Sequence, residues 1–167
     1  MSDPALEKKF AVLCGIVRGQ HFAWREAFVK LAPQVDPQAA VKLMWEITGR
    51  DTAAAYLKRI DPAEPLPAQV AELIAASSRA MGEDATAEAA DDHAFVVHNA
   101  CPWFDWHKRL NLVDEDRPGC DAWFQATVEH INRALGTNLI VTTIETLPEG
   151  GAGCVRRFSN DAREPGA

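Results

Sequence analysis

The chain has 167 residues, of which 47% are hydrophobic and 25% charged, with a formal net charge of −7 and a pI near 5.2. This size and composition predict a single globular domain that buries its own core without disulfide or metal support. An acidic chain without a cluster of lysines and arginines lacks the positive surface that phosphate contacts need, which excludes nucleic acid as an expected partner.

The sequence also predicts neither a secretory signal nor a membrane span. The N-terminus MSDPALEKKF has no basic segment followed by an apolar one, and no apolar run approaches the ~20 residues of a spanning helix. We therefore expect a cytoplasmic protein with no membrane partner. In that reducing compartment the four cysteines should be free thiols: Cys14, Cys101, Cys120 and Cys154. Each could then bind a metal, take part in catalysis or simply be buried in the core.

Residues 1–82 are predicted to be helical. The first helix begins at Asp3-Pro4, where an N-cap aspartate precedes a proline, and runs to Leu31. Spacings of three and four residues predict its apolar face, which comprises Phe10, Cys14, Val17, His21, Trp24 and Phe28. The position of Cys14 on this face assigns it to the core.

Two further helical segments follow. One begins at Asp36-Pro37, and Gly49 either ends or bends it, because the helical pattern continues through DTAAAYLKRI. After the proline-rich joint DPAEPLP, another amphipathic helix carries Val70, Leu73, Ile74 and Met81 and stops at Gly82.

Residues 83–158 are predicted to be an α+β unit. Asp91-Asp92 is the expected turn of a hairpin whose second strand is HAFVVHN, and PWFDWHKRLN and GCDAWFQATVEHINRALG are the next helices. The segment VDEDRPG between them is interpreted as a solvated loop. NLIVTTIETL and CVRRFSN are strands flanking the turn PEGGAG. The predicted fold is therefore α+β, with a helical N-terminal half, an antiparallel sheet in ββ-α-α-ββ order and a flexible tail at 159–167.

Three cysteines fall at the joints of this unit. Cys101 ends a strand, Cys120 opens a helix and Cys154 starts the last strand, so the three thiols can meet at one edge of the sheet. At a helix N-terminus, the pKa of the Cys120 thiol would be lowered. The spacing lacks paired C-x-x-C motifs, and cysteine is often simply buried, so a shared site and plain burial both remain open.

Histidines and acids near these joints are secondary candidates. His98 lies three residues before Cys101, and His107 six residues after it, whereas His93 should face away from His98 on the same strand. Asp121, placed in the first turn of a helix, could orient a ligand or a water molecule. The aromatic residues expected to wall off a pocket are Trp103, Phe104, Trp106 and Trp123.

The segments VHNACPW, GCDAWF and TTIETLPEGGAGCVRRF resemble the L-2-amino-thiazoline-4-carboxylic acid hydrolase family. The resemblance covers residues from about Asp92 to Phe158 and includes Cys101-Pro102, Cys120, and the final positions Thr142, Leu147, Gly151, Cys154 and Phe158. The closing segment is also similar to 4-vinyl-reductase-type ligand-binding domains. The sequence departs from the family in GGAGCVRR, where acids commonly flank the cysteine.

The resemblance implies a hydrolase that opens a C–N or C=N bond of a heterocyclic or amide-like small molecule. A divalent metal, zinc above all, held by Cys101, Cys120, Cys154 and His98 would activate water. In that case Asp121 or His107 would move the proton. In a metal-free version a cysteine such as Cys101 is the nucleophile, and a histidine is its base. The alternative is a non-catalytic module that binds a small ligand or senses a metal, and the chain could form a homo-oligomer in either case.

Overall fold

The structure is a computed structural model that describes residues 4–90 and 92–160. The predicted N-cap Asp3, the turn residue Asp91 and residues 161–167 of the predicted tail lie outside the described residues. Ser159 and Asn160 belong to the last strand, because both pair with β3, so the predicted start of the tail is two residues too early.

The N-terminal half is helical, as predicted. It consists of α1 (Pro4–Leu31), α2 (Pro37–Tyr56) and α3 (Leu66–Ala80). Asp36 caps α2 by accepting a hydrogen bond from the Gln38 amide at 3.1 Å. The helix continues through Gly49, which is needed there for close packing against α5 rather than to end the helix.

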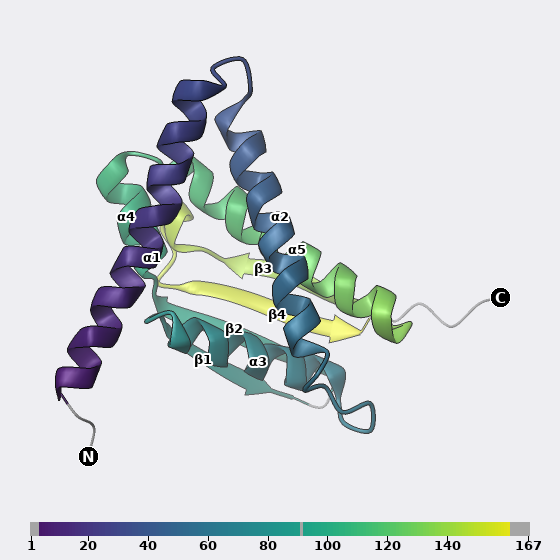
Figure 1. Cartoon of the computed structure of the whole chain (residues 1–167). Coiled ribbons are helices and arrows are strands. Elements are labelled where there is room, and N and C mark those ends of the chain that lie inside the picture. Colours follow the sequence, from purple (N-terminus) through teal and green to yellow (C-terminus); the bar gives the residue numbers. More distant parts are fainter. Residues whose placement is uncertain (1–3, 91, 161–167) are drawn as a thin grey trace.

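The C-terminal half has the predicted order of elements. It consists of β1 (Asp84–Ala89), β2 (His93–Ala100), α4 (Pro102–Leu110), α5 (Val113–Leu135), β3 (Leu139–Glu145), the short 3₁₀ helix η1 (Leu147–Glu149) and β4 (Cys154–Asn160). The sheet has the strand order β1-β2-β4-β3, and every neighbouring pair is antiparallel. The predicted α+β class with ββ-α-α-ββ order is confirmed (Figure 1).

The beginning of α5 was predicted wrongly. The helix starts at Val113 rather than Gly119, and the supposed loop VDEDRPG forms its first turns. Glu115 and Asp116 are buried there, because Arg25 of α1 and His107 of α4 lie beside them. Cys120 and Asp121 consequently lie inside the helix and not in its first turn.

The hydrophobic core lies between one face of the sheet and helices α2, α3 and α5. Ala94 and Val96 of β2 point into it, while Phe95 and Val97, on the opposite face of the strand, are only half-buried. The remaining core side chains come from all three helices and from the two last strands: Ala53, Tyr56, Val70, Ala71, Leu73, Ile74, Phe124, Val128, Ile131, Leu139, Val141 and Phe158. Among the described residues, no helix is both long and apolar enough to cross a membrane.

Helix α1 is attached to the rest of the molecule partly by polar contacts. Its Arg18 Nη1 donates to the Met81 carbonyl at 2.7 Å, and its Arg25 Nε donates to Glu115 at 2.5 Å. Cys14 is buried, as predicted. The predicted apolar face is otherwise wrong in part, because residues at positions 10, 17 and 24 are exposed.

The ring of His21 is wedged between α1, α2 and α4 beside the aromatic rings of Phe22, Trp45 and Trp103. Burial, with help from the nearby His107, lowers the pKa of His21 from 6.5 to about 4. The folded state therefore binds a proton less readily than the unfolded state, and folding stability should decrease as the pH falls from 6.5 to 4. In a His21→Phe variant this part of the decrease should be absent in urea unfolding curves taken across that pH range. An unchanged slope would contradict the role of His21.

Candidate functional site

A cavity of about 270 Å³ opens where the ends of β2 and β4 meet helices α2, α4 and α5. Its lining contains three of the four cysteines, two histidines, two acids and two arginines, set among tryptophan, phenylalanine and methionine side chains. Side chains that can act as acids, bases, nucleophiles or charged partners are therefore concentrated in a largely apolar cavity, which is typical of a small-molecule site.

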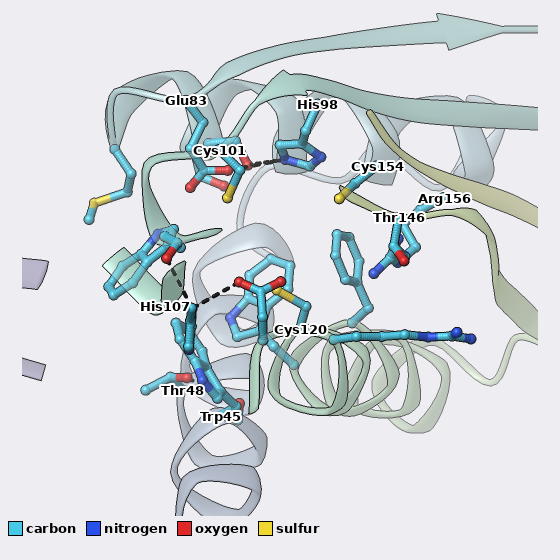
Figure 2. Close-up of a pocket in the computed structure, with 18 of the residues that line it drawn as sticks. Trp45, Thr48, Glu83, His98, Cys101, His107, Cys120, Thr146, Cys154 and Arg156 are labelled. Carbon is cyan, nitrogen blue, oxygen red and sulfur yellow. Dashed lines mark hydrogen bonds and ion pairs between the residues drawn. The ribbon is translucent and has the colours of Figure 1, made fainter. Parts of the chain in front are cut away.

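The three cysteines of the cavity come from three different elements. Cys101 is the N-cap residue of α4, directly after β2, while Cys120 lies in α5 and Cys154 begins β4. Cys154 pairs with His98 across the β2–β4 ladder, so both side chains leave the same face of the sheet. Figure 2 shows Cys101, Cys120 and Cys154 directed toward one common space.

The three thiols are poor acids in this environment. Burial, with the nearby negative charge of Glu83, raises the pKa of Cys101 to about 12. Burial also raises the pKa of Cys120 well above its usual value, with a further contribution from Asp116, and it raises the pKa of Cys154. The lowered pKa predicted for Cys120 is therefore wrong: the thiol is not at a helix N-terminus, and all three groups are protonated at neutral pH.

The first of two acid–histidine pairs at the cavity is formed by Glu83 and His98. His98 Nε2 lies 3.2 Å from Glu83 Oε2 and 3.0 Å from the Ser78 hydroxyl. Both side chains are nearly inaccessible to solvent and both line the cavity. The negative charge of Glu83 also helps to raise the pKa of Cys101, so the Glu83–His98 pair lies near this thiol at the cavity.

The second pair, Asp116 and His107, lines the cavity from α5 and α4. His107 Nδ1 donates to the Trp103 carbonyl at 2.9 Å and lies 2.8 Å from Asp116 Oδ2. Its Nε2 is buried and has no hydrogen-bond partner among the described residues. Asp116 precedes Cys120 by one helical turn, which puts the carboxylate and the thiol on the same face of α5.

Arg156 brings a buried positive charge to the cavity. Its Nη2 donates to Asp121 Oδ1 at 3.0 Å, and its Nε is buried without a hydrogen-bond partner among the described residues. Asp121 also accepts a hydrogen bond from Thr143 at 2.7 Å and does not line this cavity. The structure therefore places Asp121 behind Arg156, where it fixes the orientation of the guanidinium group.

The predicted aromatic residues divide into two groups. Trp103 and Trp123 line the cavity, together with Trp45 of α2. Phe104 and Trp106 do not: the Lys108 ammonium lies 4.6 Å from the Phe104 ring, and Trp106 stacks on Phe22 at 5.5 Å beneath α1. Phe104 therefore packs within α4, while Trp106 packs α4 against α1.

The arrangement of donors does not fit the predicted zinc centre. Within residues 4–90 and 92–160, no three His, Cys, Asp or Glu side chains are grouped closely enough to hold a metal ion. A metal bound by Cys101, Cys120, Cys154 and His98 stays a prediction.

Glu83, Asp116, Arg156 and Trp45 were missed at the sequence level. For two of them, the sequence contains a pattern that could have placed them at the site. Arg156 follows Cys154 by two residues on a strand and therefore shares its face, and Asp116 would have been placed beside Cys120 if α5 had been extended. No sequence pattern could have identified Glu83, since only the tertiary fold brings it to Cys101.

Solved structures with similar folds include two proteins that hold small molecules. One is a trafficking protein particle complex subunit 3 from Naegleria fowleri covalently bound to palmitic acid, which is 12% identical and has a TM-score of 0.52; the match covers 93% of this chain and 96% of that one. The other is the phenol-responsive sensory domain of the transcription activator PoxR with phenol, which is 14% identical with a TM-score of 0.52 and coverage of 90% and 74%. At these identities the likeness shows the fold alone.

No curated protein matches the sequence significantly. The family described as L-2-amino-thiazoline-4-carboxylic acid hydrolase matches residues 11–158, a span that includes the helical half as well as the segments Cys101-Pro102, Cys120 and Cys154. Since this match covers most of the chain, the protein belongs to the L-2-amino-thiazoline-4-carboxylic acid hydrolase family.

Proposed function

We propose that the protein hydrolyses a C–N or C=N bond of a small heterocyclic or amide-like molecule bound in the cavity, with Cys101 as the nucleophile. The observation that carries this proposal is that Cys101 shares the lining of a largely apolar cavity with the Glu83–His98 pair, whose carboxylate charge acts on the thiol. A thiol with a pKa of about 12 is almost fully protonated at neutral pH, so it needs an adjacent base to react. Glu83 supplies that base.

The chemistry balances with the side chains present and water. Glu83 takes the Cys101 proton while Sγ bonds to the electrophilic carbon and the C=N electron pair moves to nitrogen. The electron pair then returns to re-form that double bond, while the C–N bond to the second nitrogen on the same carbon breaks and this nitrogen takes the proton from Glu83 as it leaves. Water, deprotonated by Glu83, attacks the carbon held on sulfur, and the Cys101 thiol is released with a proton. His98, bonded to Glu83, orients the carboxylate throughout.

Arg156 gives the cavity a preference for an anionic substituent. Its guanidinium is buried at the cavity and held from behind by Asp121, and a carboxylate is the group that such a donor pairs with best. The compound in the family description carries a carboxylate, so it is the first substrate to test. Asp116 and His107, on the side of Cys120, form the second pair that could protonate a leaving nitrogen.

A non-catalytic ligand-binding module is the second candidate function. It is favoured by the tryptophan-rich wall of the cavity and by thiols that remain protonated. The similar structures with palmitic acid and with phenol hold ligands in this same fold. In such a module the cavity would bind a small aromatic or heterocyclic acid without turning it over.

Turnover separates the two functions. The full chain should be incubated with L-2-amino-thiazoline-4-carboxylate, hydantoins and N-carbamoyl amino acids, and the products followed by liquid chromatography and mass spectrometry. We expect ring opening of at least one compound, and acid quenching during turnover should trap an adduct on the peptide that contains Cys101. Saturable binding measured by calorimetry without any product would instead support the ligand-binding module.

A further inference from the structure

Helix α1 exposes an apolar stripe that residues 4–90 and 92–160 do not cover. Eight large apolar side chains of α1 are between 43% and 83% exposed: Leu6, Phe10, Val12, Leu13, Ile16, Val17, Trp24 and Leu31. Its inward side carries Cys14, Arg18 and Phe22 instead. Figure 1 shows α1 along the outside of the molecule. An ordinary surface helix has the opposite arrangement, with its apolar stripe turned inward.

The spacing of the stripe is that of a coiled coil. Starting at Leu6, steps of four and three residues alternate without interruption through positions 10, 13, 17, 20, 24 and 27 to Leu31. Six of these eight positions hold large apolar residues, and the other two are Gln20 and Ala27. A repeat of 3.5 residues maintained over this length is typical of a helix that packs along its whole length against another helix.

We propose that this stripe, hereafter the α1 seam (Leu6, Phe10, Leu13, Val17, Gln20, Trp24, Ala27 and Leu31), pairs with the α1 seam of a second copy of the chain. A heptad seam is complementary to itself, so two copies can meet across a two-fold axis. The single polar position, Gln20, lies near its middle and would fix the register of the two helices.

The exposed area matches what a stable dimer needs. At roughly 150–200 Å² for each fully accessible large side chain, the six large apolar residues of the seam offer roughly 560–740 Å², close to the roughly 800 Å² per partner of a standard interface. This lies at or above the upper end of the largest apolar patch of a typical monomer, roughly 300–600 Å².

Other occupants fit the seam less well. The segments outside the described residues read MSD, D and DAREPGA, and these are too short and too polar to cover about 39 Å of helix. A lipid surface is disfavoured because the chain has a net charge of −7, which is repelled by anionic headgroups. On α1 itself the exposed charges are of both signs: Glu7, Glu26, Lys8, Lys9 and Lys30.

The mass of the full chain in solution tests this proposal. Light scattering coupled to size-exclusion chromatography at about 10 µM, where a dimer with a Kd near 1 µM is mostly assembled, should give twice the 18.3 kDa of the chain. The double variant Leu13→Glu/Val17→Glu puts charges in the seam and should weaken association at least about 100-fold. Ile144→Glu is the matched control, because Ile144 is an equally exposed apolar residue on β3, and it should remain dimeric.

A monomeric wild-type chain at this concentration, or an unchanged mass of the double variant, would overturn the proposal. The proposal would also be overturned if the wild-type chain binds vesicles of phosphatidylcholine and phosphatidylserine and the double variant does not. Circular dichroism spectra show whether the double variant is folded. If it is not, Leu6→Glu/Leu31→Glu at the two ends of the seam, where the side chains are 64% and 83% exposed, replaces it with the same expected loss of dimer.

Discussion

Replacing Cys101 by alanine should reduce the rate of hydrolysis at least about 10³-fold, because the variant has lost the atom that bonds to the substrate carbon. Cys14→Ala is the matched control: Cys14 is a buried cysteine of α1 that lies outside the cavity lining, so kcat should stay near the wild-type value. Steady-state kinetics on the substrate found in the turnover screen measure both. A Cys101→Ala enzyme with wild-type kcat would exclude Cys101 as the nucleophile.

Glu83→Gln distinguishes a catalytic base from a structural residue, because its two expected effects have opposite signs. Loss of the base should reduce kcat about 10²–10⁴-fold. Loss of its negative charge should lower the pKa of Cys101 from about 12, since that charge is the second-largest cause of the raised value. Labelling of Cys101 by iodoacetamide at alkaline pH should therefore become faster while turnover becomes slower. In the double variant Glu83→Gln/Cys101→Ala no further loss is expected beyond Cys101→Ala alone.

The elements that could be predicted are those whose signal is local. Strong β-formers between turn residues predicted β2, β3 and β4, and the resulting order of strands and helices is the one observed. The placement of Cys101 and Cys154 at strand ends is likewise a local property, and both line the cavity. For these segments, propensity and tertiary environment favour the same conformation.

The buried charges could not be predicted, because their partners are far away in the sequence. An acidic stretch such as VDEDRPG is typical of a solvated loop, and only the ion pair with Arg25, ninety positions earlier, makes burial of Glu115 tolerable. The same holds for Glu83 and His98, which meet only after β2 has paired and α3 has packed. Site residues that depend on such long-range pairs are therefore the ones that a single sequence conceals.

The orientation of α1 is a related case. Periodicity identifies an apolar stripe, but it does not say whether the stripe faces the core of the same chain or a partner. Here Arg18 and Arg25 hold the inward side of the helix through the Met81 carbonyl and Glu115, so the stripe that carries Trp24 is left outside. Polar anchors of this kind are invisible to a pattern of hydrophobicity.

Alanine substitutions at two helical glycines should have opposite effects on stability. At Gly49, a Cβ would lie 2.6 Å from the Trp123 carbonyl oxygen and 3.2 Å from Thr127 Oγ1, so α2 and α5 would have to move apart. Overpacking of this kind costs about 1–3 kcal/mol, which outweighs the gain of up to about 1 kcal/mol from replacing glycine inside a helix. At Gly15 of α1 no atom lies within 4 Å of the added Cβ, so only the gain remains.

Thermal unfolding followed by circular dichroism tests both expected changes in stability. For a chain of this length each kcal/mol shifts Tm by about 2–4 °C, so Gly49→Ala should unfold several degrees earlier and Gly15→Ala a few degrees later than wild type. Because Trp123 lines the cavity and its carbonyl is the group that Cβ would strike, Gly49→Ala should also raise KM at temperatures where the variant is fully folded. A stabilised Gly49→Ala variant would mean that the two helices can separate without cost. The cavity would then not depend on how closely α2 approaches α5.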